Sequence, residues 1–302
     1  MSEVRERMVA VNAGLFHMQQ ERPHPMTDSE AARMTKTVML AGQRKASVRQ
    51  GDDVTLTRFV KTPGGADTRT RQLSLDTRHP ALMAAKSLFH AKQVRRPDEM
   101  RSLLVSGRSN MKIGRDVRKG RLRGYWIYTL SLEERATCPQ SCHHWSTCYG
   151  NNMPWAKRVD HTTDDFLPRL EREIADLLAV RGRIGILVRL HALGDFYSVD
   201  YVRFWRMLLM RHKRLAVFGY TAREPDSDIG WAVRGLASDF RERAMIRFSN
   251  AAWPVMATVP IRRPEECPSN AFVCPEQTGR TRACATCALC WGTRRNVAFL
   301  DH

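Results

Sequence analysis

Apolar and polar positions in the second half of the chain follow two alternating periods. Short runs rich in β-branched and aromatic residues predict strands at 125–132, 185–191, 215–221, 245–249 and 255–261. Between them, apolar residues recur every three or four positions, which predicts helices at 163–180, 198–212 and 227–240. This succession is typical of parallel βα units, so we predict an α/β fold. In barrel-like and doubly wound sheets alike, ligands bind in the loops that follow the strands, and we expect the chemistry there.

The first third of the chain has a weaker pattern. Residues 1–50 show little periodicity and predict a peripheral helical arm, 54–60 predicts a strand, and 80–94 predicts a helix. The opening residues lack the layout of a signal peptide, and no apolar run approaches the roughly 18 residues of a membrane span. We therefore expect a cytoplasmic protein without membrane contact.

Basic residues dominate the charge. The 302 residues include 49 Lys and Arg against 31 Asp and Glu, a net charge of +18, which attracts polyanions such as nucleic acid or phosphorylated metabolites. In the segment 108–123, Asp116 is the sole acid among seven cations. The segment is interpreted either as a path for a phosphate backbone near the mouth of the site or as a solvated loop. Three tryptophans are candidates for base stacking or for core anchors: Trp126, Trp145 and Trp155.

The eight cysteines are grouped by their spacing. Three lie within 138–148 and three within 284–290. Neighbours only three or four positions apart are poorly placed to bridge each other and well placed to converge on a metal. We therefore favour metal ligation in a reducing compartment over disulfides.

The middle cysteine loop offers three thiols after the strand at 125–132: Cys138, Cys142 and Cys148. A cubane cluster held by three cysteines keeps one iron open for an outside molecule. A structural zinc would instead recruit a fourth ligand, for which His143 and His144 are available. Spacing alone leaves both metals open.

The cysteines of the tail have the spacing CxxCxxC, preceded by one more cysteine across a gap of nine residues. The four are Cys274, Cys284, Cys287 and Cys290. Such spacing is typical of ferredoxin loops, whereas zinc sites usually pair two CxxC units across a longer gap. We predict a 4Fe-4S cluster here, with zinc as the alternative. Cys267 is left over, as a buried thiol or a replacement ligand.

Polar residues near the end of the strand at 185–191 are further candidates. Because side chains alternate along a strand, Arg189 and His191 are expected to share one face at its carboxyl end, where they would bind a ligand. In the alternative interpretation His191 is a hydrogen-bonded core histidine and Arg189 a partner of Asp195. Asp195 is itself a candidate cap for the next helix.

Two segments resemble radical S-adenosylmethionine (SAM) enzymes. YTLSLEERATCPQSCHHWSTCYG is similar to their first strand and cluster loop, although its spacing CxxxCxxxxxC is three residues longer and Thr147 replaces an aromatic residue. GILVRLHALGDFYSVDYVRFWRMLLMRHKRLAVFGYTAR is similar to their second strand, glycine-rich turn, helix and third strand. The resemblance implies SAM contacts by Gly194, Asp195, Phe196 and Tyr149. It also implies catalytic roles for Cys138, Cys142, Cys148 and Asp195. Arg189 and His191 join this candidate catalytic set through their place at the end of the strand.

Residues 108–302 closely resemble a phage and plasmid family known as "gene product 88", through the motifs RLH…GDFYS and CP…QTG…CxxCxxCW. That family has no settled activity. Combined with the radical SAM likeness, it implies an N-terminal basic and helical region at 1–107, a radical-SAM-type partial (β/α) barrel at 108–262 and an auxiliary iron-sulfur segment at 263–302.

The expected function is a radical-SAM-like enzyme with two 4Fe-4S clusters. It would use SAM and an electron donor, and act on a nucleic acid or nucleotide. One alternative is a non-catalytic nucleic-acid-binding protein of a phage or plasmid, stapled by iron-sulfur clusters or zinc. Another is an iron-sulfur enzyme whose open iron binds substrate without SAM.

Overall fold

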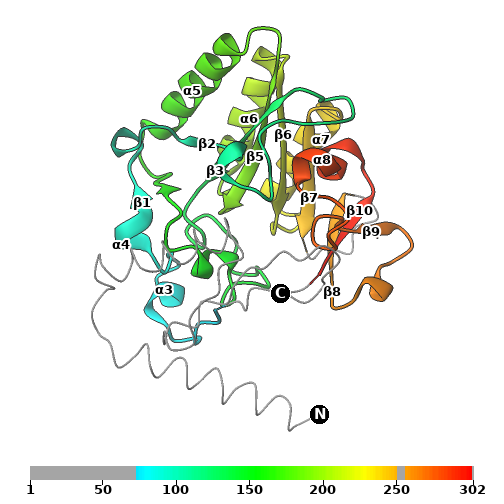
Figure 1. The fold of residues 1–302 in the computed structure, drawn as a ribbon. Coiled ribbons are helices and arrows are strands. Elements are labelled where there is room, and N and C mark those ends of the chain that lie inside the picture. Colours follow the sequence, from blue (N-terminus) through cyan, green and yellow to red (C-terminus); the bar gives the residue numbers. More distant parts are fainter. Residues whose placement is uncertain (1–72, 250–255, 301–302) are drawn as a thin grey trace, which may run out of the picture.

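One mostly parallel sheet organises the computed structural model, which describes residues 73–249 and 256–300. Its order is β2-β3-β5-β6-β7-β8-β10-β9, and only β2 runs antiparallel, against β3 (Figure 1). The strands are β2 (Leu104–Ser106), β3 (Trp126–Ser131), β5 (Ile186–Leu193), β6 (Leu215–Thr221), β7 (Ala244–Ser249), β8 (Ala257–Ile261), β9 (Ala271–Val273) and β10 (Asn296–Leu300).

The parallel strands from β3 to β8, and then β10, neighbour one another in chain order. From β3 to β8 the order never reverses, so this part of the sheet lacks the switch point of a doubly wound fold, and β9 stands out of chain order at the edge beyond β10. The sheet stays open, because β2 and β9 at its two edges do not pair with each other. Separately, β1 (Val94–Arg95) pairs with β4 (Arg158–Val159). The predicted α/β class is confirmed.

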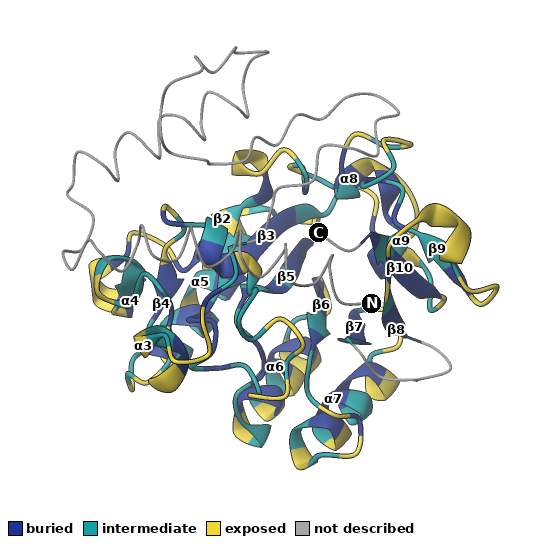
Figure 2. Ribbon diagram, turned by 90° about the horizontal axis from the view of Figure 1, so that it is seen from below, coloured by how far each residue is buried: buried dark blue, intermediate teal, exposed yellow. Residues whose placement is uncertain are grey.

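Three long helices cover one face of the sheet: α5 (Phe166–Val180), α6 (Val199–Arg211) and α7 (Asp228–Asp239). The other face is covered by the segment 110–125 and by two short helices, α8 (Cys284–Cys287) and α9 (Leu289–Gly292). Figure 2 shows the strands along an arc, with α6 and α7 outside it and α8 inside. We call the side covered by α8 the inner face.

Side-chain alternation explains the two layers. Along β5, Ile186, Val188 and Leu190 belong to the core beneath the long helices, whereas Leu187 belongs to the core of the inner face. The apolar residues predicted to lie on one side of the helix at 198–212 form the buried face of α6, and Trp205 among them is fully buried. The predicted strands and helices from 125 to 261 are confirmed, with ends shifted by a few residues.

The helix predicted at 80–94 is wrong. The structure has two short helices there, α3 (Pro80–Met83) and α4 (His90–Gln93). Between them the Ser87 N–H donates to Glu133 Oε1 at 2.8 Å and the Ser87 hydroxyl to Glu134 Oε1 at 2.7 Å. These long-range bonds replace the helical ones, so tertiary structure overrides the local preference.

Two further expectations concern the ends of the chain. The arm at 1–50 and the strand at 54–60 lie outside the described residues. The boundaries expected at 107/108 and 262/263 both fall within one sheet, because β2 precedes the first and β9 and β10 follow the second. None of the described helices is long and apolar enough to cross a membrane.

The start of α6 depends on a side-chain cap. Ser198 Oγ accepts the Tyr201 N–H at 3.1 Å. We expect Ser198→Ala to lower the free energy of unfolding by about 1 kcal/mol, because a helix N–H loses its acceptor. Chemical denaturation would measure this, with Ser198→Asp as the control that keeps an acceptor. Equal losses in both variants would contradict a capping role.

Candidate functional site

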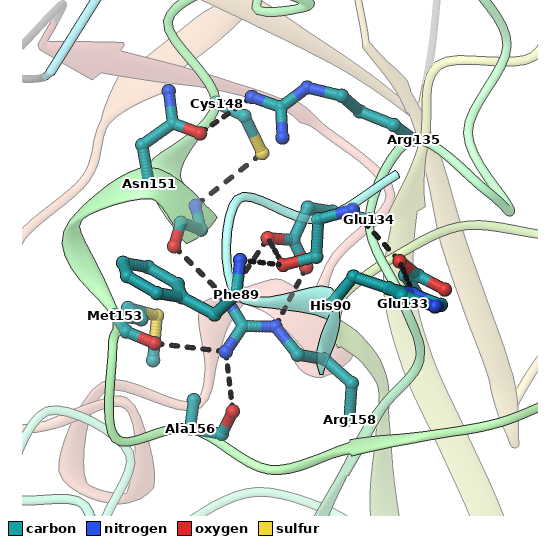
Figure 3. A network of polar contacts seen from close by, with 12 residues as sticks. Phe89, His90, Glu133, Glu134, Arg135, Cys148, Asn151, Met153, Ala156 and Arg158 are labelled. Carbon is teal, nitrogen blue, oxygen red and sulfur yellow. Dashed lines mark hydrogen bonds and ion pairs between the residues drawn. The ribbon is translucent and has the colours of Figure 1, made fainter. Parts of the chain in front are cut away.

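Buried charges hold the middle cysteine loop, which begins where β3 ends. Arg158 is fully buried and donates from Nε and Nη2 to the two carboxylate oxygens of Glu134, each at 2.9 Å. Its guanidinium also donates to the carbonyls of Gly150 and Met153, at 3.0 and 2.9 Å (Figure 3). Burial alone would raise the pKa of Glu134, but the bonds from Arg158 and Ser87 lower it overall.

Arg135 ties the same loop to its surroundings. It donates to the Trp145 carbonyl at 3.0 Å and to Asn151 Oδ1 at 2.5 Å. Asn151 in turn donates to the carbonyls of Leu73 and Ser146. The loop that carries the three thiols is therefore attached on both sides to buried charged groups.

The three thiols of this loop are free and influence one another electrostatically. Burial raises the pKa of Cys138 and of Cys142, and the carboxylate of Asp195 adds to both shifts. Burial raises the pKa of Cys148 to about 11, with Glu134 adding to it. His143 and His144 are exposed. Thiols in such surroundings hold their protons unless a cation replaces them.

Asp195 connects the loop to the ends of β5 and β6. Its two carboxylate oxygens accept the N–H groups of Phe196 and Ala222, both at 2.7 Å, and its own N–H donates to Thr137 Oγ1. Burial raises the pKa of Asp195 to about 6. Arg223 completes the connection by donating to the carbonyls of Phe196 and Thr137, both at 2.7 Å. Arg189 is therefore not the partner of Asp195, which corrects that alternative.

Gly194 allows these segments to approach. Its φ is +88°, and a Cβ there would lie 2.7 Å from Thr137 Oγ1 and 2.8 Å from Leu132 Cβ. A side chain would push the middle loop away from the end of β5. Phe196 beside it is fully buried, whereas Tyr149 after the last thiol is half exposed.

The expectation that Arg189 and His191 share a face is wrong. β3 and β5 pair Thr129 with Arg189 and Ser131 with Leu193, so one residue of β3 lies opposite three of β5. In this bulge His191 adopts a φ of 56°, which interrupts the alternation of side chains.

His191 turns toward the long helices instead. Its Nε2 lies 3.2 Å from the Tyr201 hydroxyl of α6, and its ring meets Phe196 edge-on. Burial lowers its pKa to about 3. His191 is thus the hydrogen-bonded core histidine of the alternative interpretation, and it lies apart from the thiols.

The four tail cysteines line one cavity on the inner face. The other lining residues are Phe272, Pro275, Glu276, Leu289, Trp291 and Val297. Burial raises the pKa of Cys274 to about 11 and that of Cys284 to about 12, and Cys290 adds to both. Burial also raises the pKa of Cys287. Cys267 lies elsewhere, packed beside Ile261.

Backbone bonds fix this tail on the sheet. The Cys284 and Ala285 N–H groups donate to the carbonyls of Lys112 and Ile113, at 2.7 and 2.8 Å. The fully buried Arg247 of β7 donates to the carbonyls of Cys290 and Thr293. The segment is therefore held in one position relative to β7.

Two cations stand beside the tail thiols. The charges of Arg189 and Lys112 both lower the pKa of Cys284, against the larger effect of burial. Lys112 Nζ lies 3.3 Å from Glu276 Oε2, and Tyr149 also acts on its pKa. Arg189 Nε is buried and donates no hydrogen bond within the described structure. Lys112 is thus attached to the tail by its side chain at Glu276 and by its carbonyl, which accepts the Cys284 N–H.

Comparisons with models of protein families, with curated proteins and with solved structures found no match for this chain. In the part of the chain that the structure describes, no three His, Cys, Asp or Glu side chains converge on a position for one metal ion. The arrangement provides two groups of thiols, of three and of four, rather than a formed single-ion centre.

Sequence reasoning missed the residues that hold the site. Glu133, Glu134 and Arg135 stand between the predicted strand and the first thiol, and they are buried despite their charge. Three consecutive charges before a cysteine motif were the available signal. Arg158, the partner of Glu134, lies in a segment without any motif, so only the fold could identify it.

The Arg158–Glu134 pair should carry much of the loop's stability. We expect Arg158→Met to lower the free energy of unfolding by about 3–5 kcal/mol, because a buried carboxylate loses its partner. The control is Arg203→Met, whose ion pair with Asp200 is exposed and whose loss should cost at most about 1 kcal/mol. Denaturation of the three proteins would measure this, and similar costs for both variants would contradict it.

The same pair predicts a pH dependence. The folded-state pKa of Glu134 lies below its usual 4.5, so its stabilising effect is present above that pH and is lost as the pH falls through the folded pKa. The difference in unfolding free energy between the wild type and Arg158→Met should therefore shrink between pH 7 and pH 3. A constant difference would contradict this assignment.

Proposed function

We propose that the chain is an iron-sulfur enzyme of the radical SAM type, with a partial (β/α) barrel at 108–262. The uninterrupted chain order of the parallel strands and the arc of the sheet support the barrel. One observation carries the functional proposal. Seven of the eight cysteines form two groups, three thiols in the loop after β3 and four around one cavity of the inner face.

The middle group would hold the catalytic cluster through Cys138, Cys142 and Cys148. Such a 4Fe-4S cluster supplies an iron with an open position for SAM and a source of single electrons. The buried carboxylate of Asp195 acts as a positioning residue, because its oxygens already accept backbone N–H groups of Phe196 and Ala222.

The tail group would hold the auxiliary cluster through Cys274, Cys284, Cys287 and Cys290. A cubane is larger than a single ion, so its thiolates stand further apart than the ligands of one ion. Burial raises the pKa of Cys284, and the charges of Lys112 and Arg189 beside it oppose that shift, as a thiolate ligand needs. The enclosing side chains of Trp291, Leu289 and Val297 exclude water from the position.

The substrate would lie between the two groups, near Arg189. A buried guanidinium N–H without an acceptor favours an anionic group such as a phosphate. A nucleotide or a nucleic acid carries that group, and the electron for each turnover would come from an external donor.

A second candidate is a non-catalytic protein in which both thiol groups hold structural metal, iron-sulfur or zinc. The bonds of the middle loop to Arg158 and of the tail to Arg247 favour it, because they hold the segments that carry the thiols in place. Metal content separates the two. Two zinc ions per chain in a colourless protein would remove the radical proposal.

The metal content tests the assignment of ligands. Anaerobically prepared protein should be brown and contain about eight irons per chain, the content of two cubanes. In Cys142→Ala we expect about four irons to remain and the formation of 5′-deoxyadenosine from SAM to stop, because only the middle group loses a ligand. Cys287→Ala should likewise lose about four irons, from the tail group.

Cys267→Ala is the matched control, because its thiol belongs to neither group. It should keep the full iron content and the full rate of SAM cleavage. Unchanged iron in Cys142→Ala, or SAM cleavage by that variant, would overturn the catalytic assignment. Brown protein with eight irons that never cleaves SAM would point to iron-sulfur chemistry on the substrate itself.

A further inference from the structure

Cations gather at the edge of the sheet where the parallel strands begin. The turns that lead into β3, β5, β6, β7 and β10 each carry at least two Lys or Arg residues. We call this set the amino-edge cluster. Its members are Arg118, Lys119, Arg121, Arg123, Arg181, Arg183, Lys213, Arg214, Arg241, Arg243, Arg294 and Arg295.

Backbone bonds show that these turns lie side by side. The Trp126 N–H donates to the Gly185 carbonyl at 3.1 Å, and the Ile186 N–H donates to the Arg214 carbonyl at 3.0 Å. The Val217 N–H reaches the Arg243 carbonyl at 2.6 Å. In a parallel sheet all strands begin at one edge, so turns that are far apart in the sequence meet there. The turn that follows α5 can be followed at the top of Figure 1.

The segment 108–123 divides between two positions, which corrects the expectation that it lies as a whole at the mouth of the site. Lys112 faces the tail thiols, next to Glu276. The turn from 118 to 124 lies at the amino edge, because the Val117 N–H bonds to the Tyr125 carbonyl and Asp116 pairs with Trp126 at the start of β3.

Acidic residues at this edge neutralise only part of the charge. Asp116 pairs with Arg115 and Arg118, and Glu242 pairs with Arg121. Six exposed members have no acidic partner among the described residues: Lys119, Arg123, Arg183, Lys213, Arg214 and Arg241. Burial lowers the pKa of Arg294, and repulsion by Arg241 and Arg247 lowers it further. The cluster is therefore a surface of like charges.

Helix ends explain a part of the cluster. The long helices α5, α6 and α7 end at this edge, and the carboxyl end of a helix attracts cations. That attraction reaches only the last turn of each helix. Helix ends therefore do not explain the cations of the turn at 118–124, which follows no long helix. They also do not explain Arg295, which precedes β10. The remaining excess of positive charge attracts external polyanions.

We propose that the amino-edge cluster binds the phosphate backbone of a nucleic-acid duplex, at a surface separate from the middle cysteine loop. Ten of the twelve members are arginines, whose planar donors match phosphate oxygens. No described aromatic side chain in these turns is exposed for stacking on bases, and Trp126 lies partly buried between Arg115 and Arg181. This favours backbone contact with a duplex over a single strand.

The surface lacks what a protein partner would need. The exposed large apolar side chains near these turns are Val180, Ile184 and Met210, which are too few for the apolar core of a protein interface. The four neighbouring strands β3, β5, β6 and β7 span about 15 Å at the usual strand spacing. That distance matches about four phosphates along one strand of a duplex.

The test compares two triple variants of the full chain that change the net charge equally. Arg183→Glu/Lys213→Glu/Arg241→Glu removes amino-edge cations that are distant from the cysteines in sequence. Arg101→Glu/Arg172→Glu/Arg280→Glu is the matched control, built on exposed cations of other surfaces. Fluorescence anisotropy with a duplex DNA of mixed sequence, measured across a salt series, gives the affinity and its salt dependence.

The wild type should bind the duplex with a steep salt dependence. In the amino-edge variant, affinity at low salt should fall at least about tenfold. The slope of log K against log salt should become less negative by about 2.7, which is about 0.9 for each of the three lost phosphate contacts. The control variant should bind within about threefold of wild type, because it keeps the phosphate contacts. Circular dichroism confirms that all three proteins are folded.

Several outcomes would overturn the proposal: equal weakening by both variants, tighter binding of a single-stranded oligonucleotide than of the duplex, or displacement of the duplex by polyglutamate at equal charge concentration. Iron content is measured on the same samples. Because the amino-edge variant leaves all cysteines in place, its iron content should equal that of the wild type. A failure of the duplex-binding proposal can therefore be distinguished from a failure of the iron-sulfur proposal.

Discussion

The buried pair of Arg158 and Glu134 is the interaction on which the candidate site depends. Removing two charges from water is costly, and the cost is offset only where every donor and acceptor finds a partner. Here the carboxylate accepts both guanidinium and hydroxyl donors, and the guanidinium also serves carbonyls of the loop. A glycine at 150 is required, because a Cβ there would lie 2.6 Å from the Glu134 carboxylate. The thiol loop is thus built on a charged core.

The order of the strands determines where the two thiol groups lie on the sheet. Parallel strands that follow in chain order place the loops after β3, β5 and β6 at one edge, where Thr137, Asp195 and Arg223 join them. The chain then adds β10 beside β8, and the segment between them crosses the inner face. That return places the tail thiols beside Lys112, whose carbonyl accepts the Cys284 N–H.

The parts of the site that depend on the spacing of residues along the chain could be predicted from the sequence. The parts that depend on the three-dimensional arrangement of the backbone could not. The cysteine spacing predicted that the four tail thiols gather, and they line one cavity. The prediction that His191 shares a face with Arg189 was wrong, because a bulge in β5 turns His191 toward Tyr201. The local pattern of apolar and polar residues does not reveal such a bulge. The helix predicted at 80–94 is interrupted because Ser87 bonds to two glutamates more than 40 residues away.

By itself the sequence determined the α/β class, the strands β3 and β5 to β8 with the three long helices, and the grouping of the cysteines, because periodicity and short spacings are local properties. Tertiary structure decided which of these elements meet. Residues distant in sequence meet in the Arg158–Glu134 pair, in the bonds of Asp195 to Thr137 and Ala222, and in the amino-edge cluster. The energies of these contacts depend on burial and on partners that come together only when the chain is folded.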